Sequence, residues 1–292
     1  MQNDNRSAKY RGPGRLIVAA GLVVTTMLPA VVVAQKTPTD SVRDTTHSQK
    51  QAPFFTHKDV ILAGLFAGAT LLAAPFDRRA ALQLQDSSTQ ANHFLKNTST
   101  GVELIASPGA YVIGGTLYAV GRLGRYDRVA DLGLHGTEAV LFAQGVTYML
   151  KGVVGRSRPF MTNAKDPDDF HLGKGFSSGD WSSFPSGHTS TAFAAAAAVT
   201  NESTRWWPNS TWVVGPLMYA GATAVGLSRM YHNKHWASDV ALGAAIGTFS
   251  GRKVVQYQHG HPGNRLDQLL LRTSIVPNGH GGGLLSVTLP TP

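Results

Sequence analysis

The chain has 292 residues, 42% of them hydrophobic, which is enough to bury one sizeable core and allows one or two domains. It contains no cysteine, which excludes disulfide bonds and thiolate metal sites. The net charge of +9 suits an anionic partner, but no run of Lys and Arg with interleaved aromatics appears, so we do not expect nucleic-acid binding.

The N-terminus has the features of a secretory signal. Four basic residues precede an uncharged stretch over residues 16–34, which ends in Val-Val-Ala. We therefore predict a signal peptide over residues 1–34, cleaved after Ala34, and export to the cell envelope. An uncleaved anchor is the alternative, because the 19 uncharged residues are just enough to span a bilayer. Residues 35–57 are polar and lack periodicity, which predicts a flexible linker.

Six uncharged apolar stretches follow, separated by polar connectors. Their lengths and their Ala, Gly and Leu content favour helices over strands. We predict an all-α fold, a compact bundle of about six core helices, in a domain over residues 58–258. The Gly- and Pro-rich tail over 259–292 has some strand character, which suggests a short hairpin. The six stretches are 60–76, 104–121, 139–150, 184–201, 206–228 and 240–251.

Membrane association is the favoured interpretation of this bundle. The stretch 206–228 is long enough to span a bilayer, and its small residues would let helices pack closely in lipid. The stretch 240–251 is short, however, and the mean hydropathy of −0.07 is low for a protein with many spans. A soluble periplasmic protein is therefore the alternative.

Three short clusters along the chain combine cations, hydroxyl groups and histidines. The cations Lys151, Arg158 and Arg229 can each neutralise a phosphoryl oxygen, and the two Arg side chains can do so bidentately. Ser186 and the Gly187 backbone can add neutral donors. Both directly precede an Ala-rich stretch, which puts their amides near a helix N-terminus, where the dipole favours an anion. These residues predict a phosphate-binding site.

Two histidines accompany these donors, His188 in the second cluster and His235 in the third. His235 and Asp239 are four residues apart, which places them on the same face of one helical turn. The carboxylate can then accept the N–H of one ring nitrogen and leave the other aimed at phosphorus. In the alternative interpretation, Ser238 and Asp239 only cap the helix that follows.

This combination resembles the type 2 phosphatidic acid phosphatase superfamily over about residues 132–251. The pattern of that family runs Lys, six residues, Arg-Pro; then Pro-Ser-Gly-His; then Ser-Arg, five residues, His, three residues, Asp. Every position is filled here. The resemblance implies that His235 becomes a phosphohistidine and that His188 protonates the departing alkoxide as a general acid.

We therefore expect a phosphatase that hydrolyses phosphate monoesters or diphosphates of envelope lipids, such as phosphatidic acid or an isoprenoid diphosphate, with its site facing the periplasm or exterior. Three fixed cations can stabilise a phosphoryl transition state, so we expect no metal and no other cofactor. The alternatives are a soluble acid phosphatase for small phosphoesters, a vanadium-dependent haloperoxidase of the same superfamily, and a catalytically silent phospholipid-binding envelope protein.

The remaining histidines match no position of the pattern. We interpret His232, His259, His261 and His280 as surface or loop residues that bind no metal, because none has a paired spacing with acids. The connector over residues 160–184 lies between two of the clusters. We expect it either to form part of the mouth of the pocket or to be an inert surface loop.

Overall fold

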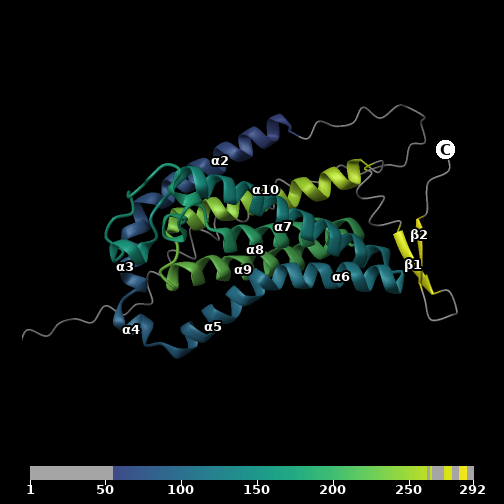
Figure 1. Cartoon of the computed structure of the whole chain (residues 1–292), viewed down its shortest axis with the longest axis horizontal. Coiled ribbons are helices and arrows are strands. Elements are labelled where there is room, and N and C mark those ends of the chain that lie inside the picture. Colours follow the sequence, from purple (N-terminus) through teal and green to yellow (C-terminus); the bar gives the residue numbers. More distant parts are fainter. Residues whose placement is uncertain (1–54, 262–263, 265–272, 278–282, 288–292) are drawn as a thin grey trace, which may run out of the picture.

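Helices make up most of the part of the chain that the computed structural model describes, which is residues 55–261, 264, 273–277 and 283–287 (Figure 1). The prediction of an all-α bundle is confirmed. The predicted signal peptide and nearly all of the predicted linker lie outside the described residues. The helices are α2 (His57–Ala73), α3 (Asp77–Leu84), α4 (Ser87–Gln90), α5 (His93–Leu104), α6 (Ala110–Gly124), α7 (Asp127–Val154), α8 (Gly187–Trp206), α9 (Thr211–Tyr231) and α10 (Ala237–Gly260).

The six predicted stretches fall on α2, α6, α7, α8, α9 and α10. The helix α5 was not predicted, because polar and charged residues interrupt its sequence. Near the C-terminus, β1 (Thr273–Pro277) and β2 (Gly283–Val287) pair antiparallel, with Thr273 opposite Val287. This pair lies in the segment where the sequence suggested a short hairpin.

The end of α7 is fixed by a glycine. Gly155 has a φ of +59°, a left-handed conformation, and its N–H donates to the carbonyl of Lys151 at 3.1 Å. Any larger residue would also collide with the carbonyl oxygen of His171. Lys151 therefore lies in the last helical turn, and the chain turns away directly afterwards toward Arg158.

The helix α8 lies at the centre of the bundle and packs against α7, α9 and α10 (Figure 1). Its contact with α10 depends on three glycines spaced four residues apart, Gly243, Gly247 and Gly251. A Cβ atom at Gly243 would lie 2.5 Å from the carbonyl oxygen of Ser186, and the other two face backbone atoms of α8 in the same way. Small residues thus allow the two backbones to approach closely.

Large apolar side chains lie mostly on the outside of this bundle, whereas its buried positions are rich in Ala, Ser and Thr. Two helical segments, His57–Leu84 and His93–Gly124, are long and apolar enough to cross a membrane, and only 11% of the most apolar window of each is buried. A bilayer would cover this apolar exterior. Exposed examples are Val60, Ile61, Leu65, Val112, Ile113, Leu141, Met149, Trp212 and Leu217.

We predict that Gly247→Ala destabilises the protein by about 1–3 kcal/mol, because the added methyl group must push α10 away from α8. Gly221→Ala in α9 is the matched control: a Cβ atom there meets nothing within 4 Å. The control should leave stability unchanged or raise it by about 0.5–1 kcal/mol. Denaturant unfolding of both variants measures the difference, and an equal effect would contradict the close packing.

Candidate active site

The predicted site residues meet where α7 and α9 end and where α8 and α10 begin. The structure therefore joins segments that are far apart in sequence at one end of the bundle. Lys151 belongs to the end of α7, Arg158 to the loop after it, Ser186, Gly187 and His188 to the start of α8, Arg229 to the last turn of α9, and His235 and Asp239 to the start of α10.

Lys151 and Arg158 approach the start of α8 from one side. The Nζ of Lys151 donates to the carbonyl of Ser182 at 2.5 Å, and its Cε is 3.6 Å from where a Cβ of Gly187 would be. Burial, with the nearby charges of Arg158 and Arg229, lowers the pKa of Lys151 to about 7. Burial and Arg229 likewise lower the pKa of Arg158. A bound anion would relieve this repulsion among the cations.

Arg229 contributes the third cation and is anchored by an acid that was not predicted. Its Nη1 is 2.6 Å from the Oε2 of Glu103 on α5. Glu103 also accepts hydrogen bonds from Ser228 at 3.2 Å and pairs with the Nδ1 of His232 at 2.8 Å. The Nε of Arg229 is buried and has no hydrogen-bond partner among the described residues. This donor is therefore available for a ligand.

The geometry of His235 and Asp239 is close to the predicted relation. The Nδ1 of His235 faces the Oδ2 of Asp239 at 3.6 Å, slightly longer than a hydrogen bond, and this nitrogen has no hydrogen-bond partner in the described part of the chain. The same Oδ2 accepts the backbone N–H of Trp236 at 2.8 Å and the hydroxyl of Ser183 at 2.5 Å. Asp239 therefore caps α10 and also faces the imidazole.

The charge states of this pair follow from their surroundings. Burial, helped by Lys151, lowers the pKa of His235 to about 3, although Asp239 acts in the opposite direction. Burial opposes ionisation of Asp239, but Arg156, His235 and Ser183 outweigh it and lower the pKa of its carboxyl to about 2. At neutral pH a neutral imidazole therefore lies beside an ionised carboxylate.

Arg156 holds Asp239 in place, and sequence reasoning missed it. Its Nη1 donates to the Oδ1 of Asp239 at 2.6 Å and to the hydroxyl of Ser238 at 2.7 Å. Its Nη2 donates to the Oδ2 of Asp77 at 2.7 Å, and Asp77 also accepts the backbone N–H of Ser238. Arg156 is two residues from Arg158, and the Arg-Pro pattern selected Arg158 and gave no sign of the buried role of Arg156.

The start of α8 differs from the prediction in one detail. The backbone N–H of Ser186 donates to the carbonyl of Asp239 at 2.9 Å, so the expectation that this amide is free for an anion is wrong. The hydroxyl of Ser186 accepts from Thr189 at 2.8 Å, which leaves its own proton available to donate. Burial and the charge of Arg229 lower the pKa of the adjacent His188 to about 4.

The connector and two of the other histidines also take part in contacts. The connector supplies the carbonyl of Gly179, which accepts from the Nε of Arg158 at 2.8 Å, so it contacts a predicted site residue. His232 pairs with Glu103, and His259 lies on α10 and pairs with Glu202. The spacing along the sequence did not show these acidic partners, since the acids come from distant helices. His232 lies in the turn after α9, as a loop residue would, whereas His259 is part of a helix. His280 lies outside the described residues.

Residues 134–261, which make up less than half of the chain, match the family model of the PAP2 superfamily. The matched region contains every predicted site residue, so the resemblance seen in the sequence is confirmed. The lipid A 1-phosphatase of Porphyromonas gingivalis is 46% identical over 71 residues, which make up 24% of this chain but only 15% of that protein.

A solved structure is also similar: the crystal structure of the first transmembrane PAP2 type phosphatidylglycerolphosphate phosphatase from Bacillus subtilis. It is 19% identical in sequence, and the alignment covers 70% of this chain and 97% of that chain, with a TM-score of 0.35.

We predict that Arg156→Met destabilises the protein by about 3–5 kcal/mol, because it leaves the buried carboxylates of Asp77 and Asp239 without their cation. Arg158→Met is the control. This substitution removes one of three mutually repelling cations and breaks none of the described ion pairs with a carboxylate. The Arg158→Met variant should therefore lose much less stability than Arg156→Met. Chemical denaturation compares the two, and equal losses would argue against the network.

Proposed function

We propose that this protein is a phosphatase that releases phosphate from a phosphate monoester or diphosphate of a membrane lipid, through a phosphohistidine at His235. The observation that carries the proposal is a set of three cations, the buried Arg229 and the partly buried Lys151 and Arg158, next to two histidines whose pKa values are low. Such a set can neutralise the equatorial oxygens of a phosphoryl group while the imidazoles remain uncharged.

In the first step, the lone pair on the Nε2 of His235 attacks phosphorus. The bond between phosphorus and the alcohol oxygen breaks, and its electron pair leaves on that oxygen, which takes a proton from His188. The Nδ1 of His235 keeps its proton and points it at Asp239. The distance of 3.6 Å between these groups should shorten as the ring becomes positively charged.

In the second step, a water molecule attacks the phosphohistidine and gives a proton to His188. The bond between phosphorus and nitrogen breaks, and its electron pair returns to the Nε2 of His235. Inorganic phosphate leaves and both histidines regain their initial states. His188 thus acts first as an acid and then as a base.

The low pKa of His188 fits this dual role once a substrate is bound. Burial and three cations lower it to about 4 in the free site. A phosphate dianion would neutralise much of that positive charge, which raises the pKa and lets His188 hold the proton that the leaving group needs. We therefore expect His188 to be protonated in the enzyme–substrate complex and neutral in the free enzyme.

A lipid substrate is supported by the surface of the protein. The segment His57–Leu84 ends near the site, because Asp77 within it binds Arg156. The segment His93–Gly124 carries Glu103, which binds Arg229. Both apolar segments therefore reach the phosphate site, which would then lie near the headgroup depth of a bilayer. The predicted export would place this site on the periplasmic or exterior side.

We expect the purified full chain to release phosphate in the presence of EDTA, fastest from a short-chain phosphatidic acid or an isoprenoid diphosphate and slowest from p-nitrophenyl phosphate. His235→Ala should abolish the release, and His188→Asn should reduce it by about 10²–10⁴-fold. A brief acid-free quench with labelled substrate should trap label on wild-type protein and none on His235→Ala.

Three results would contradict the proposal. A preference for the small ester would favour a soluble acid phosphatase. Halide oxidation that requires vanadate would favour a haloperoxidase. Phosphate binding by folded wild-type protein without any release would favour a silent binding protein.

We also predict that kcat/KM falls as the pH rises through about 7, because the free enzyme loses the charge of Lys151 there. A lysine with a lowered pKa is charged below that pKa and neutral above it. Lys151→Arg keeps its charge to much higher pH, so the alkaline limb should move up by more than one pH unit, even where the overall rate is lower. An unmoved limb would assign this titration to another group.

A further inference from the structure

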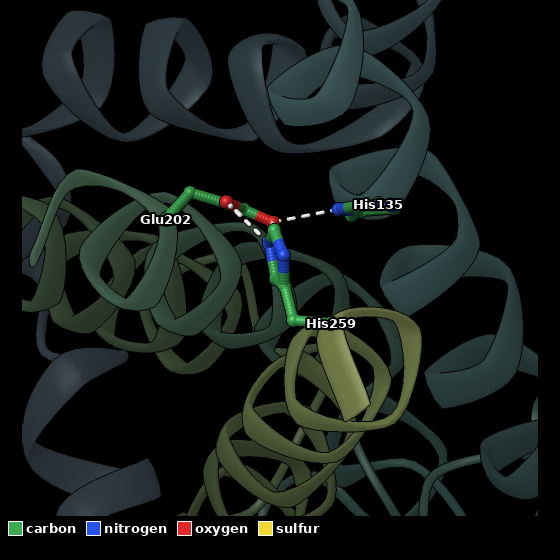
Figure 2. Close-up of side chains that lie close together, drawn as sticks. All are labelled: His135, Glu202 and His259. Atoms are coloured by element: carbon green, nitrogen blue, oxygen red, sulfur yellow. Dashed lines mark hydrogen bonds and ion pairs between the residues drawn. The ribbon is translucent and has the colours of Figure 1, made fainter. Parts of the chain in front are cut away.

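A second cluster of ionisable groups lies outside the candidate active site. Figure 2 shows His135 from α7, Glu202 from α8 and His259 from α10 pointing toward one another. The Nδ1 of His135 is 2.6 Å from the Oε1 of Glu202, and the Nε2 of His259 is 2.9 Å and 3.0 Å from the two oxygens of that carboxylate. Three distant parts of the sequence thus place two imidazoles on one acid.

The cluster is at the opposite end of the bundle from the phosphate site. On α7, His135 precedes Lys151 by 16 residues, which corresponds to about 24 Å along the helix. On α10, His259 follows Asp239 by 20 residues, or about 30 Å. The proposed phosphatase chemistry therefore has no use for these side chains, and their arrangement needs its own explanation.

The donor set suits a metal ion of the zinc type. Two histidine nitrogens and one carboxylate oxygen form a known combination of zinc ligands, with a fourth position left for water. The ligand atoms of the three residues lie within 4.8 Å of one another, and tetrahedral ligands of zinc are about 3.3 Å apart, so small side-chain rotations suffice. The side chain of His259 is 23% exposed, which gives an ion a path to two otherwise buried ligands.

We propose that His135, Glu202 and His259 form a binding site for a divalent transition-metal ion, with zinc the best match, that ties together the ends of α7, α8 and α10. The Nδ1 of His135, the Nε2 of His259 and a carboxylate oxygen of Glu202 are the ligand atoms. As the metal binds, the hydrogen bonds between these atoms are replaced by metal bonds, so neither ring carries a proton on its ligating nitrogen.

The role of such an ion would be structural. It would bind the folded chain, in which the three helices meet, and not the unfolded one, and it would therefore stabilise the fold. The shortest separation is along α8, where Glu202 follows His188 by 14 residues, or about 21 Å, so the ion makes no contact with a reacting group. Catalysis should accordingly continue when the metal is removed.

The test uses the full chain, purified without a polyhistidine tag and stripped with EDTA. Zinc should bind at one equivalent, measured by metal analysis after desalting, and should raise the unfolding midpoint by about 5 °C or more, while magnesium should not. Cobalt should give the visible absorption of a tetrahedral site in the wild-type protein, which tests the site without any variant.

His259→Gln should lose the bound zinc and the rise in the midpoint. His261→Gln, two residues further along, is the matched control and should keep both, because His261 contacts only Tyr257 among the contacts described for its ring. Phosphate release should be the same with and without zinc. Failure of the wild-type protein to retain zinc, or equal zinc binding by His259→Gln, would overturn the proposal and leave a cluster held by hydrogen bonds alone.

Discussion

The buried guanidinium of Arg156 is the interaction on which the rest of the site depends. It lies between two carboxylates, Asp77 at the start of α3 and Asp239 at the start of α10, and both are fully buried. A buried ion pair contributes little net stability, since desolvation offsets most of the attraction. Its value is positional: the ion pairs fix the first turn of α10, and with it the direction in which Asp239 faces His235.

The charges around the candidate phosphate site are close to balance before any ligand binds. Four cations, Arg156 and the three predicted ones, face the carboxylates of Asp77, Glu103 and Asp239. Each of these carboxylates pairs with an arginine, and the hydrogen bonds of Lys151 and Arg158 within the described part of the chain go to carbonyl and hydroxyl oxygens. The positive charge of Lys151 and Arg158 is therefore not neutralised by a carboxylate, and it lies beside the histidines. This local excess of positive charge, and not the net charge of the chain, would attract a phosphate group.

The sequence located the proposed catalytic and phosphate-binding residues better than the residues that hold them in place. Lys151, His188, His235 and their partners could be found because their spacing forms a pattern within about a hundred residues. Asp77 and Glu103 could not, because they come from helices far away in sequence and occur in no motif. Uncharged runs located most of the helices. They placed the start of α7 twelve residues too late, because the first half of this helix contains charged residues, which interrupt an uncharged run.

The distribution of side chains in the bundle links its fold to its setting. Helices that meet through Gly, Ala and Ser bury little apolar area, so the hydrophobic effect alone stabilises them weakly in water. The close approach of the helix backbones instead adds dispersion contacts. These contacts stabilise the bundle in lipid as well as in water. Large apolar side chains on α2, α6 and α9 would then face lipid, where their exposure has no energetic penalty. In such an arrangement polar interactions at the two ends of the bundle, Arg156 at one and Glu202 at the other, carry the specificity that a larger apolar core provides in water-soluble proteins.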